Sequence, residues 1–323
     1  MSDILVLVEH RQGAVRDVTF EMLAAGRQLG ALLGVGVEAV LLAEHPDALV
    51  PALAGQADRV ICAAGPAFKE FSYEPYQRAL VKLAAERRPK AVLIAHSAFG
   101  TDLGPSLAVA LDCGLVSDAI GFAKTGDGLV VSRGMYSGKM VADWAAGGEP
   151  VVVMVRPSQF KPETPALTSE TVRWDAGDVV AGAKTRFITL EEVPTTGIDI
   201  TKATVIVGVG RGVKEEKNLA LVKEFAADIG AVLAASRPVV DAGWLPKEVQ
   251  IGSSGKTVKP KIYIALGISG AFQHVAGMKG ADVIIAVNKD PNAPIFAVAH
   301  YGIVDDMQKV VPVLRARLKE MKS

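Results

Sequence analysis

The feature that most constrains the fold is a repeated alternation of short, β-branched apolar runs with longer helical patterns. Strands that alternate with helices predict a parallel sheet joined by right-handed crossovers. The first part of the chain is therefore predicted to be an α/β domain. Its expected strands are 4–8, 35–42, 59–62 and 91–95, and its expected helices are 18–33, 73–87 and, after a loop at 96–102, a helix through Ala110.

The pattern changes after residue 126 and then starts again near residue 203. Strands are expected at 129–132 and 151–156, joined by a short connection as an antiparallel extension. Residues 157–197 are rich in Pro, Thr, Glu and Gly and lose periodicity, which is typical of an interdomain passage. A last strand of the first domain is expected at 188–193.

A fresh β-α-β pattern fills the rest of the chain. Its strands are expected at 203–208, 231–235, 261–266, 283–287 and 295–299, and its helices at 214–229 and 305–321. The chain is thus predicted to be α/β with two domains, each a mainly parallel sheet flanked by helices. The boundaries are 1–190 for the N-terminal domain and 200–323 for a doubly wound C-terminal domain.

Composition excludes several classes of function. Lys+Arg and Asp+Glu are both 35, so the net charge is zero and nothing in it favours nucleic acid or an anionic membrane. The two cysteines, Cys62 and Cys113, form no CxxC pair and no cluster with histidine, so neither a metal site nor a disulfide framework is expected. No apolar stretch is long enough for membrane insertion, and the first residues do not resemble a signal peptide. A cytoplasmic or equivalent soluble compartment is expected.

Glycines and hydroxyl groups gather where the strands of the second domain end. Ligands of doubly wound sheets bind at the carboxyl ends of the strands, so these residues predict a binding site. Four successive strand ends carry Gly208-Val-Gly-Arg211-Gly, Ser236-Arg237, Gly267-Ile-Ser269-Gly270-Ala271-Phe272-Gln273-His274 and Asn288-Lys-Asp.

Each of these segments has two interpretations. Residues 267–270 suit either a pyrophosphate, bound by backbone N–H groups at a helix start, or an ordinary tight turn. Arg211 and Arg237 could lie beside a phosphate and a planar ring, or be surface residues. His274 could be a structural histidine. The glycine-rich loop 250–256 either binds a ligand or is mobile.

The residues together resemble one family. Lys261-Ile-Tyr-Ile-Ala-Leu-Gly-Ile-Ser-Gly-Ala-Phe-Gln-His-Val-Ala-Gly277, continued by Ile284-Ile-Ala-Val-Asn-Lys-Asp-Pro291, closely resembles the signature of electron transfer flavoprotein alpha subunits. The resemblance covers residues 203–320 and extends more loosely to Ser97–Asp102 and Leu115–Asp118. It implies one FAD in the second domain, closed over by a beta subunit in an obligate heterodimer. The first domain, which lacks a glycine-rich loop after residues 5–8, would be a nucleotide-binding-like scaffold that packs on beta.

The resemblance also implies a role for individual positions. Arg211 would lie near the phosphates, Ser236 near the flavin, and Arg237 beside its ring; Asn288 and Asp306 would hold the adenosine end. Cations and donors near a flavin stabilise its reduced, negatively charged form, which makes Arg237, His274 (near the C2 carbonyl) and Ser254 the residues expected to tune its potential. The full set of expected cofactor-binding residues is Arg211, Ser236, Arg237, Gln250, Ile251, Gly252, Ser253, Ser254, Gly267, Ser269, Gly270, Ala271, Phe272, Gln273, His274, Asn288, Asp306 and Met307.

Ser253, Ser254, Phe272 and His300 depart from the residues more usual in that family, which bears on redox tuning and partner choice. Two redox functions stay open at this point. The first is an electron carrier with no catalytic residue of its own, with AMP or a second FAD in beta. Its electrons would come from acyl-CoA dehydrogenases and pass to a quinone oxidoreductase or a ferredoxin-linked acceptor. The second is an electron-bifurcating, NADH-linked flavoprotein with a second FAD in beta. A third hypothesis, from another class of protein, is a nucleotide-binding module or an NAD-dependent deacylase.

Overall fold

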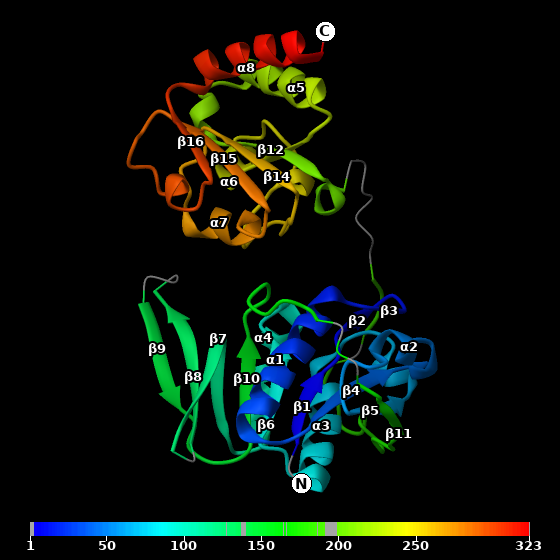
Figure 1. Ribbon diagram of the computed structural model, residues 1–323. Helices are drawn as coiled ribbons and strands as arrows, with labels where there is room; N and C mark the ends of the chain where they lie inside the picture. The colour runs from blue at the N-terminus through cyan, green and yellow to red at the C-terminus, as the bar shows by residue number, and fades with distance from the viewer. Residues whose placement is uncertain are drawn as a thin grey trace. The chain divides into compact units, whose positions relative to one another are not determined.

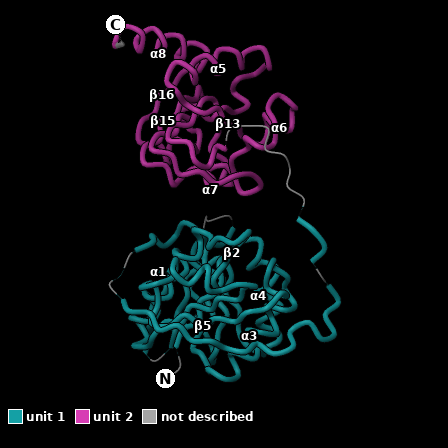
Figure 2. The backbone as a smooth tube through the Cα atoms, turned by 90° about the vertical axis from the view of Figure 1, so that its right-hand side faces the viewer, with its two compact units in different colours: residues 1–190 teal, residues 191–323 magenta. Residues whose placement is uncertain are grey.

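The chain forms two compact units, residues 1–190 and residues 191–323, shown in different colours in Figure 2. The computed structural model describes residues 3–126, 128–136, 140–163, 165, 167–185, 187–190 and 199–322. Each unit has a main sheet and hydrophobic cores of its own. The predicted α/β class with mainly parallel sheets is confirmed.

The first unit is built on a nine-stranded sheet, whose strands Figure 1 shows side by side from β9 at one edge to β11 at the other. All neighbours from β11 to β7 are parallel, and only β8 and β9 join antiparallel. The strands in spatial order are β11 (Glu170–Arg173), β5 (Arg59–Ala64), β4 (Val37–Ala43), β1 (Ile4–Leu7), β6 (Ala91–Ala95), β10 (Val151–Val155), β7 (Gly114–Thr125), β8 (Gly128–Met135) and β9 (Met140–Ala145).

Helices cover both faces of this sheet, and alternate residues of β1 show it. Ile4 and Val6 belong to the core with α1, whereas Leu5 and Leu7 belong to the core with α3 and α4. Side chains of a strand point alternately to opposite faces, so this division is that of a doubly wound sheet. The remaining elements are α1 (Asp17–Leu33), α2 (Val50–Leu53), α3 (Tyr73–Arg87), α4 (Ala98–Ala110), the hairpin β2 (His10–Arg11) and β3 (Ala14–Val15), and the 3₁₀ turns η1 (Pro46–Ala48) and η2 (Pro66–Phe68).

The prediction for residues 151–156 was wrong about pairing. They form β10, an inner parallel strand between β6 and β7, and the antiparallel extension consists of β7, β8 and β9. All five residues of β10 are buried, whereas five of the six in β9 are exposed. A continuous apolar run is typical of a strand covered on both faces, and this run should have been assigned to the parallel sheet.

The expected last strand of the first domain, 188–193, is also wrong where it can be tested. Residues 188–190 form no strand, and 191–193 lie outside the described residues. The last strand of the unit is instead β11, at the sheet edge beside β5. The chain after β11 is held to α3 by side chains, because Lys82 donates to the Asp175 carbonyl (2.7 Å) and Glu74 accepts from the backbone N–H of Thr185 (2.8 Å).

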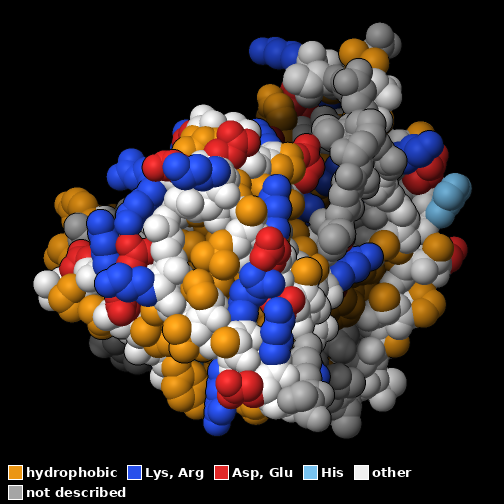
Figure 3. Space-filling model, turned by 90° about the horizontal axis from the view of Figure 1, so that it is seen from above, with side chains coloured by type: hydrophobic (Ala, Val, Ile, Leu, Met, Phe, Trp, Pro, Cys, Tyr) orange, Lys and Arg blue, Asp and Glu red, His pale blue; other side chains and the backbone are white. Residues whose placement is uncertain are grey.

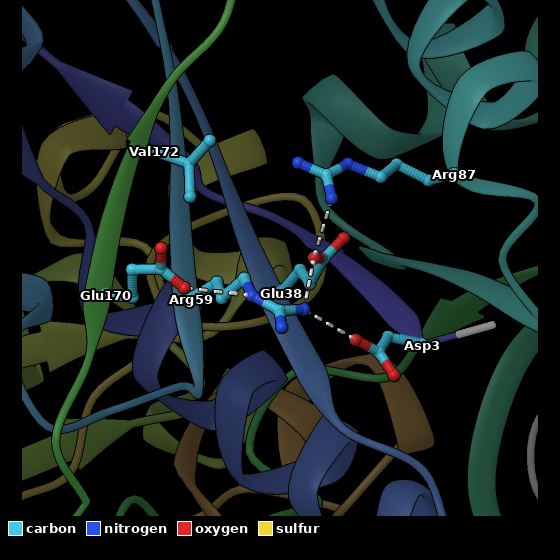
Figure 4. Close-up of a pocket in the computed structure, with 6 residues that line it drawn as sticks. All are labelled: Asp3, Glu38, Arg59, Arg87, Glu170 and Val172. Atoms are coloured by element: carbon cyan, nitrogen blue, oxygen red, sulfur yellow. Dashed lines mark hydrogen bonds and ion pairs between the residues drawn. The ribbon is translucent and has the colours of Figure 1, made fainter. Parts of the chain in front are cut away.

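A charged cluster fastens β11 to the sheet, as Figure 4 shows. Arg59 donates to Asp3 (3.2 Å), to Glu38 (3.1 Å) and to Glu170 on β11 (3.2 Å). Glu38 is buried and lies 3.6 Å from Arg87. These residues border a hollow of about 450 Å³ at the amino ends of the strands. Since its charges are paired with one another, we interpret the cluster as one that stabilises the fold.

The second unit is a five-stranded parallel sheet with helices α5 and α8 on one face and α7 on the other (Figure 1). Val207 and Leu266 belong to the core with α5 and α8, and Ile206 and Ala265 to the core with α7. In spatial order the strands are β13 (Val232–Ala235), β12 (Val205–Val209), β14 (Ile262–Leu266), β15 (Val283–Asn288) and β16 (Tyr301–Val304); the helices are α5 (Leu219–Asp228), α6 (Arg237–Asp241), α7 (Phe272–Met278) and α8 (Met307–Lys322), with the 3₁₀ turns η3 (Ile200–Lys202), η4 (Arg211–Val213), η5 (Glu216–Asn218), η6 (Lys247–Val249) and η7 (Pro294–Ala297).

Two predicted elements of this unit were misplaced. The helix expected at 214–229 begins only at Leu219. Lys214 has φ +68°, which an α-helix cannot contain, and residues 216–218 form the 3₁₀ turn η5. The strand expected at 295–299 is the 3₁₀ turn η7, and the strand follows at Tyr301. Pro294 opens that turn, where its missing N–H costs nothing.

On the face seen in Figure 3, cationic, acidic and apolar side chains are interspersed, in keeping with the balanced composition. Among the described helices, none combines the length and the apolar character that a membrane span requires.

Candidate functional site

A cavity of about 680 Å³ opens in the second unit at the carboxyl ends of the strands. The chain runs from β12 to β13 on one side and then crosses to β14 on the other, so the strand order reverses between β12 and β14. Ligands of open α/β sheets bind in the crevice at such a switch point. The loops after β12 and β14 both line the cavity, the first with Arg211 and Gly212 and the second with Gly267, Ile268 and Ser269.

Glycines let these two loops touch backbone to backbone. Gly212 donates its N–H to the Gly267 carbonyl (3.0 Å), and a Cβ on Gly212 would lie 2.6 Å from the Gly267 Cα. Gly267 itself has φ +62°, a left-handed conformation that favours glycine. Side chains at these positions would push the loops apart, so the shape of the cavity depends on the glycines.

A run of unpaired backbone N–H groups follows β14. None of the N–H groups from Ser269 to Gln273 has an acceptor among the described residues, whereas those of His274 and Val275 both donate to the Ala271 carbonyl. Ser269, Ala271 and Gln273 line the cavity. Consecutive free N–H groups at the edge of a sheet suit an anion.

The charged side chains that line the described part of the cavity are all cationic: Arg211, Lys214, Arg237 and Lys289. Lys214 is paired with Asp306 (2.6 Å), and the hydrogen bond from Lys214 is the main reason that the pKa of Asp306 is lowered. Arg237 opens α6, is 68% exposed and lies 3.2 Å from Asp241. The cavity therefore carries a positive field.

The loop 250–256 closes one side and is tied to α7. Ser253 donates its N–H to the Gln273 carbonyl (2.8 Å), and the side chain of Gln250 donates to Ser254 Oγ (3.0 Å). His274 adds a second tie to α7, because its Nδ1 lies 3.2 Å from the Ile251 carbonyl oxygen, whereas the Gln250–Ser254 bond lies within the loop. The loop is thus fixed in place at the cavity wall.

Most of the residues expected from the sequence meet at this cavity. Those that line it are Arg211, Ser236, Arg237, Ile251, Gly252, Ser253, Ser254, Gly267, Ser269, Ala271, Gln273, His274 and Asn288. The others lie around it: Gln250 is buried behind Ser254, Gly270 lies against Ile295, Phe272 is 43% exposed, Asp306 pairs with Lys214, and Met307 is buried in the core.

The sequence interpretation left out five residues that line the cavity: Gly212, Lys214, Pro238, Ile268 and Lys289. Gly212, Ile268 and Lys289 lie inside motifs that were recognised, and Pro238 directly follows Arg237. Lys214 gave no such signal, because it was assigned to the start of a helix. Its left-handed conformation turns the chain there and lets it reach Asp306.

Comparisons with known proteins agree with this geometry. A family model described as the electron transfer flavoprotein domain matches residues 4–179, and one described as the electron transfer flavoprotein FAD-binding domain matches residues 199–279. The chain is 37% identical to electron transfer flavoprotein subunit alpha of Bacillus subtilis over 326 residues, covering 98% of each chain. It is 38% identical to the subunit of the same name from Methylophilus methylotrophus over 321 residues, covering 98% of this chain and 99% of the relative.

Another relative has a different name. The LctC subunit of a lactate dehydrogenase (NAD(+),ferredoxin) from Acetobacterium woodii is 38% identical over 322 residues, which cover 96% of this chain and 75% of the relative. Among solved structures, a thiamine diphosphate-dependent 4-hydroxybenzoylformate decarboxylase from Rhodococcus jostii matches with a TM-score of 0.24 at 12% identity, over 93% of this chain and 54% of the other. A TM-score this low carries no argument.

The class defined by the fold and the matched domains is that of flavin-dependent electron transfer proteins. The chain belongs to the electron transfer flavoprotein family, as an alpha subunit. This confirms the resemblance identified from residues 261–277 and 284–291. The residues around the cavity also fit FAD, since free N–H groups and cations suit its diphosphate and the apolar walls of Ile251, Ile268 and Pro238 suit a ring.

Proposed function

We propose that the cavity of the second unit binds one FAD and that the chain passes electrons between an acyl-CoA dehydrogenase-type flavoenzyme and an acceptor such as a quinone oxidoreductase. One observation carries the proposal. Most of the residues that line the cavity at the switch point lie in the segment that matches the FAD-binding family model, and the cavity has free N–H groups, cations and apolar walls. The chain is then a carrier subunit, and fatty acid β-oxidation is a natural setting for it.

The chain's own residues would bind and orient the cofactor. The N–H groups from Ser269 to Gln273 and the guanidinium of Arg211 would hold the diphosphate, since both can donate hydrogen bonds to anionic oxygens. Ser236 and the loop residues Ile251–Ser254 would border the ring, with Arg237 beside it. Asn288, Asp306 and Met307 would lie at the adenosine end. Bound FAD supplies the redox chemistry, and the cations bias it toward the reduced, negatively charged form.

A beta subunit is expected to complete the site in an obligate heterodimer, with the first unit packing on it. The support is that loop 250–256 is tied down by Ser253 and His274, which leaves the closing of the open cavity to another chain. Sedimentation of the chain expressed alone tests this. A stable, flavin-saturated monomer would contradict the proposed heterodimer.

A second candidate function is electron bifurcation, which the name of the LctC relative favours. In that case the beta subunit holds a second FAD and NADH, and the acceptor is linked to ferredoxin; in the simple carrier, beta holds AMP. The nucleotide content of the purified heterodimer separates the two. FAD and AMP in equal amounts support the carrier, whereas FAD alone, at two per heterodimer, supports bifurcation. A cytoplasmic or equivalent soluble compartment stays a prediction.

A further inference from the structure

A buried tyrosine and a buried histidine face each other behind the cavity wall. Tyr263, on β14, is fully buried, and its Oη lies 2.9 Å from Nε2 of His274. His274 is 6% exposed, lines the cavity and lies 3.2 Å through Nδ1 from the Ile251 carbonyl oxygen. Both ring nitrogens of His274 are therefore used inside the protein.

These two contacts determine the tautomer of the ring. A carbonyl oxygen can only accept a hydrogen bond, so Nδ1 of His274 carries the proton and donates to Ile251. In a neutral imidazole the other nitrogen then has only a lone pair. Nε2 must accept, and the Tyr263 hydroxyl must donate to it. The two ring nitrogens could exchange roles only if one of these partners were lost.

The surroundings disfavour a charged ring. Arg211, Lys214, Arg237 and Lys289 line the same cavity, and the nearby carboxylates of Asp241 and Asp306 are already paired with Arg237 and Lys214. Lys256 of the loop is likewise paired, with Asp199 (3.5 Å). Burial lowers the pKa of His274 to about 4, against the opposing effect of the hydrogen bond to Ile251. The imidazole is therefore neutral at working pH.

Space for the hydroxyl comes from a glycine in the neighbouring strand. A Cβ on Gly208, in β12, would overlap the hydroxyl of Tyr263. Gly208 is a diagonal neighbour of Tyr263 on the paired strand, since the register sets Ile206 opposite Tyr263 and Ala265 opposite Gly208. A methyl group on Gly208 would displace the hydroxyl without removing it. Two substitutions at different positions can therefore break the same contact.

We propose that Tyr263 is a positioning residue of the flavin site: its hydroxyl holds His274 as the neutral Nδ1–H tautomer, so that the imidazole fastens loop 250–256 at Ile251 and adds no positive charge to the cavity. The proposal rests on the proposed function for its link to FAD. It revises the expected redox role of His274. The positive field on the flavin then comes from the arginines and lysines, with Arg237 as the one expected beside the ring.

The test uses the full-length chain, labelled with ¹⁵N-histidine and purified with its beta subunit. Long-range ¹H–¹⁵N spectra between about pH 5 and pH 8 report the protonation of each ring nitrogen. Of the five histidines, the His274 signals are those lost in His274→Gln. The variants are Tyr263→Phe and Gly208→Ala, and the control is Tyr76→Phe, because Tyr76 Oη lies 3.2 Å from Nε2 of His10 in a second buried pair, within the first unit.

In the unsubstituted protein we expect His274 to stay neutral, with its proton on Nδ1, over this whole range. Tyr263→Phe and Gly208→Ala should both shift the Nε2 signal to that of a nitrogen without a donor, and Tyr76→Phe should leave it in place. Because burial, and not the Tyr263 hydroxyl, lowers the pKa of His274, the ring should stay neutral in Tyr263→Phe, and only the distribution of the proton between the two ring nitrogens should change.

The proposal is overturned if Nε2 carries the proton in the unsubstituted protein, if His274 titrates there between about pH 6 and pH 7, or if both variants leave its signals unchanged. The histidine spectra do not need a cofactor. If the heterodimer contains no FAD, they still decide the role of Tyr263 toward His274, and only the proposed function fails.

Discussion

The two units have the same kind of doubly wound sheet, yet they differ at the edge where such sheets bind ligands. In the second unit the strands on either side of the switch point, β12 and β14, are followed by Gly210-Arg-Gly212 and Gly267-Ile-Ser-Gly270. In the first unit the corresponding strands, β1 and β6, are followed by Glu9 and by His96 and Ser97. The loops with glycines border the cavity described above, whereas in the first unit Glu9 is buried and accepts a hydrogen bond from Ser97.

Side chains and their charges fill the corresponding place in the first unit. Glu9 is 3% exposed, accepts from Ser97 Oγ and from Arg16 (2.8 Å), and its burial raises its pKa despite these partners. Nearby, Arg156 holds both carboxylate oxygens of Asp118 (2.7 and 2.5 Å). Cations and anions thus neutralise each other there, whereas the cations of the second unit lack carboxylates on the described cavity wall.

The sheet topology gives both units a switch point, and the residues of the loops beside it determine whether an anion can bind there. A switch point becomes an anion site when glycines leave backbone N–H groups free and the charged side chains on the cavity wall are cations. The same place becomes part of the structural core when an acid such as Glu9 occupies it. The following changes should break or sharpen this difference.

The largest effect is expected from Gly267→Ala in the second unit. The new Cβ would lie 2.8 Å from the Gly212 Cα, at a residue with φ +62°, so the two loops must separate. We expect FAD affinity to fall by about a hundredfold, or about 3 kcal/mol, in a fluorescence titration of the heterodimer.

Gly230→Ala is the matched control, because Gly230 has a similar φ of +64° but nothing within 4 Å of the new Cβ. It shares the backbone strain without the collision and should keep its FAD. Equal FAD affinity in the two variants would show that the contact between the loops does not shape the site.

The sequence predicted this difference only in part, and the reason is physical. Glycines after strands are visible in a sequence, so residues 208–212 and 267–270 were found. Pairing between distant segments is not visible, and the run 151–155 was therefore assigned to the wrong part of the sheet although its apolar character is plain. The Tyr263–His274 contact was missed for the same reason, since it joins β14 to α7 through side chains alone.

Breaking the ion pair of the first unit should lower stability without touching the cofactor. Burial acts to raise the pKa of Asp118, but the hydrogen bonds and charge of Arg156, aided by His96, hold it below its usual value. Asp118 also has φ +59°, which costs free energy in a residue other than glycine. Arg156→Ala should therefore lower the free energy of unfolding by roughly 2 kcal/mol, measured with denaturant, with FAD content unchanged.

Arg173→Ala is its control, since Arg173 pairs with Asp47 at the surface, where both side chains are more than half exposed. That variant should stay within about 0.5 kcal/mol of the unsubstituted protein. A loss of FAD in Arg156→Ala would contradict the view that this edge of the first unit is structural.

Acid should weaken the second unit through His274. Its folded pKa of about 4 is below the ordinary 6.5, so the unfolded chain binds the proton more tightly, and stability is lost as the pH falls from about 6.5 toward 4. Between pH 7.5 and pH 5 the loss from this group is on the order of 2 kcal/mol. Hydrogen exchange of the β14 amides measures it within the second unit.

His274→Gln should remove this part of the pH dependence, and His45→Gln, at an exposed histidine of the first unit, should not. An unchanged pH profile in His274→Gln would mean that folding leaves the pKa of His274 at its ordinary value, against its burial between Tyr263 and Ile251.

The smallest effect in free energy, and the most specific, is expected from Arg237→Ala. A guanidinium keeps its charge at working pH and attracts a reduced flavin beside it. At about 4 Å and an effective dielectric near 20 this attraction is about 4 kcal/mol before screening. The side chain is 68% exposed and Asp241 lies 3.2 Å away, so a fraction of that survives. About 1.4 kcal/mol is near 60 mV for a one-electron couple, and we expect Arg237→Ala to lower the first flavin potential by several tens of millivolts with FAD retained.

Arg237→Lys should recover part of the shift, and Asp241→Asn should move the potential the opposite way, because it removes the opposing charge. Spectroelectrochemical titration of the three variants decides the matter: an unchanged potential in Arg237→Ala would make Arg237 a surface residue and leave the positive field of the cavity to Arg211, Lys214 and Lys289.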